Sequence, residues 1–342
     1  MDQRISSLDG ARAISIALVV LAHLRLTVGW PLLWRVDYAN LGVRTFFVIS
    51  GFLITSLLLK EIKRTGSVDL KDFYVRRAFR IMPAYYFYAG TIAVLIPTGL
   101  VAATYSSLLP AVFYYSNYHL ASGALGMTWS LSVEEQFYLL WPATLFFLGL
   151  RRAKLACFVL LFTAPAFRLL YEWHYWPFYS KFASESVCDT LATGCLLALF
   201  RERLWSISLY RRCVESGWAF LILPAAILLA AAQRPVWFQV TIGVSLLNFG
   251  IAITLDRCMR FPKVGAARFL NLTPVVWLGT ISYSLYLWQQ IFAFNDHLPV
   301  LLKLACMFGM ATLSFYAIER PFLALRRRLQ RQPDMALGTS VG

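Results

Sequence analysis

Long apolar runs separated by short polar segments dominate the pattern of the chain. An α-helix needs about 20 mostly apolar residues to cross the hydrocarbon core of a bilayer, and ten runs approach that length. An eleventh apolar stretch, 105–118, is shorter, contains Pro110 and is rich in Ser, Tyr and Asn. The pattern predicts an all-α integral membrane protein with about ten transmembrane helices, at roughly 11–29, 41–59, 79–97, 133–150, 154–171, 186–201, 217–233, 236–254, 275–294 and 298–318.

The lysines and arginines predict the side of the membrane on which each polar segment lies. They cluster in every second segment, and the positive-inside rule places such clusters in the cytoplasm. Both termini are then cytoplasmic, and 105–118 must be re-entrant or interfacial to keep the number of crossings even. The clusters comprise Arg4 with Arg12 and the basic residues of 60–80, 151–154, 201–212, 257–268 and 320–331, whereas the alternate loops hold Arg35, Lys181 and Arg234.

Composition supports a membrane protein and narrows its partners. Hydrophobic residues are 59% of the 342 and charged residues 14%, whereas soluble domains carry roughly 25% charged residues. The net charge of +15 falls on one predicted side of the membrane, so topology explains it and no nucleic-acid partner is expected. The six cysteines show no zinc-type spacing, and no metal site is expected. We expect one transmembrane domain over 1–325 and a basic, disordered cytoplasmic tail over 326–342.

His23 is the most conspicuous polar residue in an apolar run. Arg12 lies eleven positions earlier, which on a helix is the same face within about 20° and a separation of about 16 Å. A histidine inside a bilayer is costly unless it has a use, and imidazole is the usual proton-transfer group at neutral pH. A structural histidine bonded to a neighbouring helix is an equally weighted alternative.

Arg77 and Arg80 form an RxxR pair where the basic 60–80 segment enters the third predicted span. Residues three apart lie on one helix face, and two guanidinium groups there suit a phosphate or pyrophosphate. The alternative is that they are topology-setting arginines satisfied by anionic lipid.

The segment 129–138, WSLSVEEQFY, opens the fourth predicted span, on the outer side. Glu134 and Tyr138 are four apart and share a helix face. Ser132 and Glu135 fit a capping box, which gives Glu135 a structural explanation. Convergence of Glu134 and Tyr138 with His23 would make a general-base site, although the sequence does not show that they converge.

The chain resembles the membrane-bound acyltransferase 3 family of bacterial O-acyltransferases over about residues 5 to 325. Five motifs match in order and spacing. They are Leu8-Asp9-Gly10-Ala11-Arg12-Ala13 with His23, Phe46-Phe47-Val48-Ile49-Ser50-Gly51-Phe52-Leu53-Ile54, the pair Arg77 and Arg80, the run 129–138 followed by Trp141-Pro142, and 281–288 with Glu319-Arg320-Pro321-Phe322.

The chain also departs from the family pattern. Gln289 follows Trp288 where the family often has His, and Arg44 stands where an acidic residue is common, a change that could favour an anionic acceptor. Ala11 and Ala13 replace Leu and Gly. Because the chain ends soon after its last predicted span, we expect no C-terminal SGNH-type hydrolase domain of the kind that some members carry.

The resemblance implies transfer of an acyl group, often acetyl, from a cytoplasmic acyl-CoA to a hydroxyl of a cell-surface glycan or lipid-linked sugar. It implies a multi-pass protein of the bacterial cytoplasmic (inner) membrane, with acyl-CoA as a co-substrate and no permanently bound cofactor. His23 and Glu134 are then the catalytic candidates, and His23 could act as a general base or carry the acyl group. Arg12, Arg77 and Arg80 are the donor-binding candidates, and the supporting residues are Asp9, Ser130, Glu135 and Tyr138.

Two other classes of function stay open. A glycan or lipid transporter or flippase would show inverted repeats and interrupted helices at matching positions, and neither is evident in the sequence. A non-catalytic partner in envelope assembly would carry the same polar residues without chemistry.

Overall fold

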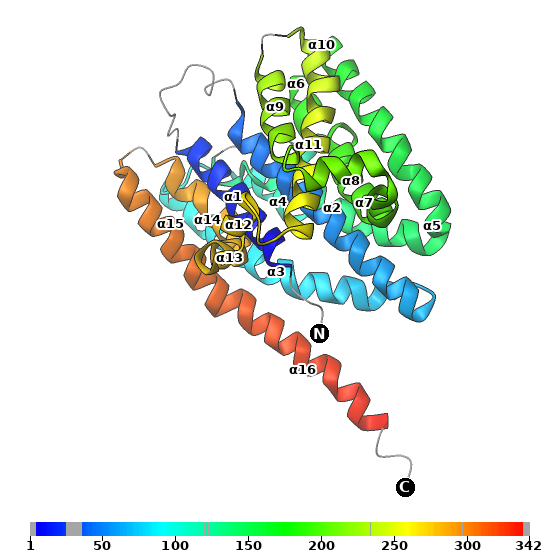
Figure 1. Cartoon of the computed structure of the whole chain (residues 1–342). Coiled ribbons are helices and arrows are strands. Elements are labelled where there is room, and N and C mark those ends of the chain that lie inside the picture. Colours follow the sequence, from blue (N-terminus) through cyan, green and yellow to red (C-terminus); the bar gives the residue numbers. More distant parts are fainter. Residues whose placement is uncertain are drawn as a thin grey trace.

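The computed structural model describes residues 5–24, 36–119, 121, 123–232, 234–295 and 297–337, with side chains described through residue 329. Over these ranges the chain is helical and contains no strand, which confirms the all-α class (Figure 1). The first part holds α1 (Ser6–His23), α2 (Tyr38–Thr65), α3 (Leu70–Leu95), η2 (Ile96–Thr98), α4 (Tyr105–Val112), η3 (Ser116–Tyr118) and η4 (Gly123–Leu125).

The second part begins with a long helix, α5, which breaks at Gly149, where φ is 71°. Its elements are α5 (Thr128–Trp173), α6 (Pro177–Phe182), α7 (Ser184–Ser206), α8 (Ser208–Glu215), α9 (Ala219–Ala231), α10 (Val236–Phe238), η5 (Gln239–Gly243), α11 (Val244–Arg260), α12 (Ala266–Leu270), α13 (Thr273–Thr280), α14 (Ser282–Ala293), α15 (Val300–Ser314), η6 (Phe315–Glu319) and α16 (Arg320–Leu337).

Six helical stretches in the described part of the chain are long and apolar enough to cross a membrane, or seven if α8 and α9, bent by 90°, form one broken span. This supports a multi-pass membrane protein with fewer clear spans than the ten expected. The Gly149 break lies at the end of the expected span 133–150, before the expected span 154–171, and 275–294 is divided between α13 and α14. The six stretches are Ser6–His23, Tyr38–Thr65, Leu70–Thr98, Pro177–Ser206, Val236–Arg260 and Val300–Leu329.

Two expectations about short segments can be compared with the structure. Within 105–118, α4 has eight residues, or about 12 Å of helix, which is too short to cross a core of about 30 Å. At the other end, α16 continues as a helix to Leu337, through most of the segment 326–342 for which we expect a disordered tail. Leu, Ala and Arg, which dominate the start of α16, are strong helix formers. Residues 338–342 lie outside the described part.

Local sequence explains how α2 and α3 begin and end. Asp37 caps α2 by accepting a hydrogen bond from the backbone N–H of Asn40 at 2.9 Å. Gly66, with φ 81°, ends α2 in the left-handed conformation that glycine tolerates best. Asp69 then caps α3 through the N–H of Asp72 at 2.9 Å. Gly66 and Asp69 thus set the turn between α2 and α3 within the basic segment 60–80.

Small residues bring the central helices into close contact. A Cβ on Gly51 of α2 would lie 2.1 Å from the carbonyl oxygen of Leu191 on α7, and one on Gly194 would lie 2.1 Å from that of Val48. Such close backbone approach is typical of helices packed in membranes. The helices pack most extensively in the pairs α1–α2, α2–α7 and α5–α7, and α14 packs against α1 and α15 (Figure 1).

Candidate active site

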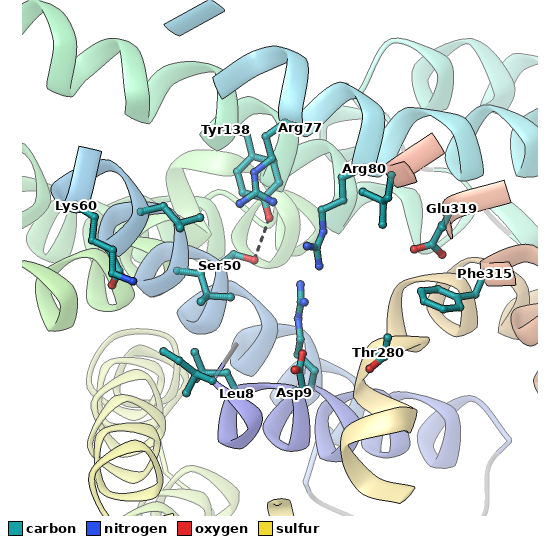
Figure 2. Close-up of a pocket in the computed structure, with 16 residues that line it drawn as sticks. Leu8, Asp9, Ser50, Lys60, Arg77, Arg80, Tyr138, Thr280, Phe315 and Glu319 are labelled. Carbon is teal, nitrogen blue, oxygen red and sulfur yellow. Dashed lines mark hydrogen bonds between the residues drawn. The ribbon is translucent and has the colours of Figure 1, made fainter. Parts of the chain in front are cut away.

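A cavity of about 480 Å³ lies where α1, α2, α3 and α5 meet α13, η6 and α16. We call it the arginine cavity, because Arg12 of α1 and Arg77 and Arg80 of α3 line it together. Figure 2 shows Arg80 directed from α3 into the space between α3 and the Asp9 end of α1. The structure therefore brings together the three arginines that the sequence singled out. The other polar lining residues are Asp9, Ser50, Ser56, Lys60, Tyr138, Thr280 and Glu319.

The charge in the arginine cavity favours an anion. Four cationic side chains line it against two carboxylates, Asp9 and Glu319. The Arg77 guanidinium lies 4.6 Å from the centre of the Tyr138 ring, which fixes its position by a cation–π contact. Arg80 is exposed within the cavity. Guanidinium groups that remain reachable are suited to binding phosphate oxygens.

A hydrogen-bonded group of Ser50, Glu134 and Tyr138 joins α2 to α5 at the arginine cavity. The Ser50 hydroxyl donates to Glu134 Oε1 at 2.7 Å, and the Tyr138 hydroxyl donates to Ser50 Oγ at 3.0 Å. Ser50 and Tyr138 both line the cavity. Glu134 and Tyr138 thus act on one face, as their spacing predicted.

His23 lies in a different place, as the last residue of α1. It lines a second cavity of about 310 Å³, the histidine cavity, with Asp37, Asn40, Trp129 and Tyr286 among its neighbours. The structure therefore does not bring Glu134 and Tyr138 to His23, contrary to the convergence that we considered. The reason is the start of α5: it begins at Thr128, which carries Glu134 about 9 Å into the helix and toward Ser50.

Gln289 of α14 holds the imidazole of His23. Its Oε1 lies 2.8 Å from Nδ1 of His23, and the Gln289 side chain is fully buried. When Oε1 accepts, Nδ1 carries the proton, and Nε2 of His23 is left as the basic nitrogen. The contact is the bond to a neighbouring helix that a structural histidine would make. The cavity beside the ring is what a catalytic histidine needs.

Two further bonds fix the wall of the histidine cavity. Ser130 Oγ lies 2.6 Å from the Tyr286 hydroxyl, and Gln290 Oε1 accepts the N–H of Met127 at 2.9 Å. Both bonds tie the start of α5 to α14. Ser130 therefore supports this cavity, a position that could not be predicted from the sequence.

Glu135 does not close a capping box, and that expectation is wrong. α5 begins four residues before Ser132, whose hydroxyl donates to the carbonyl of Thr128 at 2.9 Å and accepts the N–H of Ser116 at 3.2 Å. Ser132 is an interior residue that anchors η3. No cap accounts for Glu135.

Sequence reasoning gave no role to four residues that the structure places at the two cavities: Ser50, Gln289, Tyr286 and Glu319. Ser50, Tyr286 and Glu319 lie in matched motifs, and Gln289 directly follows one. The sequence feature that could have identified Gln289 is its polarity, because two adjacent glutamines, at 289 and 290, are costly inside an apolar helix of a membrane protein. Within the part of the chain that is described, no group of three His, Cys, Asp or Glu side chains could hold a metal ion.

A family model described as an acyltransferase domain matches residues 5–320. A relative from Bacillus subtilis, provisionally named the peptidoglycan O-acetyltransferase YrhL, is 30% identical over 93% of this chain and 54% of its own length. The O-acetyltransferase OatA of Staphylococcus aureus is 28% identical over 92% of this chain and 56% of its own length. The chain thus spans about half the length of these curated relatives. No solved structure matches it.

Proposed function

The chain belongs to the acyltransferase family whose domain model covers residues 5–320, and on that premise we propose that it is a membrane O-acyltransferase. It moves an acyl group, acetyl in the first instance, from acyl-CoA to a hydroxyl of a cell-surface glycan. The names of the two relatives favour peptidoglycan as the acceptor class. One observation carries the proposal: helix α1 joins a cationic cavity at Arg12 to a second cavity at His23.

The two cavities fit opposite sides of a membrane. In the proposed topology, ten spans place both termini in the cytoplasm of a bacterial cell, and the protein lies in the cytoplasmic (inner) membrane. The arginine cavity, which Lys60 lines beside the basic 60–80 segment, then opens toward the cytoplasm. In the same topology the histidine cavity lies toward the outer side of the membrane, from which a cell-surface glycan can enter.

The arginine cavity is proposed to bind the phosphates of the donor. Arg12, Arg77 and Arg80 supply guanidinium groups, and Lys60 a further positive charge. Glu134 is proposed to act here, by orienting Ser50 and offsetting part of the cationic charge. Asp9, Tyr138 and Glu135 are proposed as supporting residues, of which Asp9 and Tyr138 line this cavity and Glu135 follows Glu134 in α5.

The acyl group is proposed to be transferred at His23. Arg12 and His23 are about 16 Å apart along α1, a distance comparable to the reach of the pantetheine arm. As a general base, His23 Nε2 would take the proton of the acceptor hydroxyl while the oxygen of that hydroxyl attacks the thioester carbonyl carbon. The carbon–sulfur bond then breaks, and the proton passes to the CoA thiolate. A covalent acyl-histidine is the alternative course.

A transfer assay tests the proposal. The purified protein in lipid nanodiscs is given labelled acetyl-CoA and a soluble peptidoglycan fragment, and label in the glycan is measured for wild type and His23→Ala. We expect transfer by the wild type and background transfer by the variant. Equal labelling of the glycan by both proteins would contradict the proposal, and so would absence of any acyl-CoA turnover.

A further inference from the structure

A third cavity, of about 230 Å³, adjoins the histidine cavity. Asp37 and Asn40, at the start of α2, line both. We call it the Arg44 cavity, after the arginine that lines it one turn further along α2. A ligand that reaches His23 therefore has room to extend past Asp37 into this second space.

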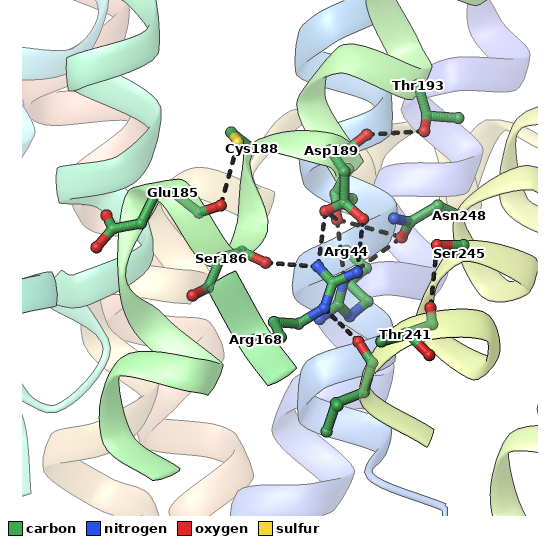
Figure 3. A network of polar contacts seen from close by, with 12 residues as sticks. Arg44, Arg168, Glu185, Ser186, Cys188, Asp189, Thr193, Thr241, Ser245 and Asn248 are labelled. Atoms are coloured by element: carbon green, nitrogen blue, oxygen red, sulfur yellow. Dashed lines mark hydrogen bonds and ion pairs between the residues drawn. The ribbon is translucent and has the colours of Figure 1, made fainter. Parts of the chain in front are cut away.

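Two buried arginines line the Arg44 cavity, and they differ in whether a carboxylate pairs with them (Figure 3). Arg168 of α5 donates through Nη1 and Nη2 to the two carboxylate oxygens of Asp189, at 3.0 and 2.9 Å. Its Nη1 and Nε also donate to the carbonyl oxygens of Ser186 and Val240. Arg168 is thus a fully paired structural residue.

Arg44 is buried, with 5% of its surface exposed, and its hydrogen-bond partners are neutral. Its Nε donates to Asn40 Oδ1 at 2.5 Å, and its Nη1 donates to Thr190 Oγ1 at 2.8 Å and Asn248 Oδ1 at 3.4 Å. Among the described side chains no carboxylate oxygen lies within 4.0 Å of Arg44, and Nη2 has no hydrogen-bond partner. Asp189, which pairs with Arg168, and Asp37 act on Arg44 only from beyond hydrogen-bond distance. A buried guanidinium that no anion contacts directly is costly, and an incoming anion would offset part of that cost.

The remaining charges of the Arg44 cavity suit a sugar. Asp37 is engaged as the cap of α2, and Glu172 and Lys181 carry opposite charges. The carboxylates can accept hydrogen bonds from hydroxyl groups, and the side-chain amides of Asn40 and Gln239 can both accept and donate them. A ligand with one oxyanion among several hydroxyls would match this lining better than a neutral sugar or a bare anion.

We propose that the Arg44 cavity is an acceptor subsite, in which Arg44 binds a carboxylate of the glycan while a nearby hydroxyl of the same glycan lies beside His23. This proposal rests on the proposed function. It specifies the chemical class of the acceptor as an acidic rather than a neutral sugar. Arg44 is then a residue that determines specificity. It holds the acceptor and takes no part in the bond that is made.

Binding without the donor tests the subsite independently of catalysis. Affinity for a short acidic glycan and for the same glycan with its carboxylates converted to methyl amides is measured by calorimetry on the protein in nanodiscs. The proteins are wild type, Arg44→Gln, Arg44→Lys and the control Arg234→Gln, since Arg234 is an exposed arginine outside the cavity. We expect the wild type and the control to prefer the acidic glycan. Arg44→Gln should lose roughly 10- to 100-fold in affinity for that glycan alone, with part of the loss restored in Arg44→Lys.

Three outcomes would overturn the subsite: equal affinity of the wild type for both glycans, an equal loss for both in Arg44→Gln, or an Arg44-dependent preference for a matched phosphorylated glycan alone. The last would assign the cavity to a carrier-lipid phosphate. Unchanged affinity of each variant for acetyl-CoA shows that it is folded. Arg44-dependent binding without any transfer would contradict the proposed function and leave the subsite supported.

Discussion

The imidazole Nδ1 of His23, at the end of α1, lies 2.8 Å from the side-chain oxygen of the buried Gln289 on α14. This bond leaves Nε2 of His23 as the nitrogen that can accept a proton. It also leaves Nε2 of Gln289 buried without a partner among the described residues. An unsatisfied amide nitrogen is a cost, which the protein bears to orient the histidine.

The first prediction follows from this bond. Gln289→Leu removes the acceptor that selects the Nδ1–H form of His23, so kcat should fall roughly 10-fold or more while KM for acyl-CoA stays the same. Gln289→Glu keeps an acceptor oxygen at the same reach and should restore most of kcat. Steady-state kinetics at saturating acceptor measure both. Equal kcat in Gln289→Leu and wild type would show that the contact only packs the helices.

The second prediction concerns the donor. Arg77→Ala and Arg80→Ala should each weaken acyl-CoA binding by about 1.5–3 kcal/mol, the strength of a charged hydrogen bond, with the exposed Arg80 at the lower end. Calorimetry with a non-hydrolysable acyl-CoA measures the loss. Arg64→Ala is the matched control, because Arg64 is an exposed arginine of the same basic segment outside the cavity. An unchanged affinity in the double variant would mean that the pair serves topology alone.

The third prediction separates the two adjacent carboxylates. Glu134→Gln should reduce transfer at least about 10-fold, because a neutral amide neither takes the Ser50 hydroxyl bond as strongly nor offsets the arginines. Glu135→Gln should have a smaller effect, since Glu135 neither caps α5 nor lines the arginine cavity. Transfer rates of the two variants at matched protein levels decide this. A larger loss in Glu135→Gln would reverse the assignment.

The fourth prediction tests the packing that positions the cavities. A Cβ on Gly51 would meet the Leu191 carbonyl at 2.1 Å, so Gly51→Ala should destabilise the protein by about 1–3 kcal/mol or more through overpacking. Gly90→Ala on α3 meets nothing within 4 Å and should be neutral or slightly stabilising. Thermal unfolding in detergent compares them. Equal unfolding midpoints for the two variants would show that α2 and α7 can move apart enough to accommodate the added methyl group.

Much of the arginine cavity could be predicted from the sequence. Charge distribution and helical spacing predict that Arg12, Arg77 and Arg80 lie on one side of the membrane, and the structure gathers them at one cavity. The face shared by Glu134 and Tyr138 also followed from their spacing, because periodicity within one helix needs no tertiary information.

The starting residue of α5 and the contacts between helices could not be predicted from the sequence. The sequence does not say where α5 begins, and a start at Thr128 moved Glu134 away from His23 and removed the cap assigned to Glu135. Gln289 departs from the family pattern, but its contact with His23 joins residues 266 positions apart. Which helix neighbours which depends on packing, and hydropathy carries no signal for it.

The central claim is that His23 performs the chemistry of transfer, and His23→Gln tests it most directly. Glutamine keeps similar bulk and a hydrogen-bonding group but cannot move the proton or carry the acyl group. Transfer from labelled acetyl-CoA to the glycan and binding of acetyl-CoA are measured on the same nanodisc preparation. We predict a loss of transfer of at least about 10²-fold with donor affinity unchanged, because the donor phosphates are proposed to bind at the arginine cavity, toward the other end of α1. Near-normal turnover in His23→Gln would contradict the account.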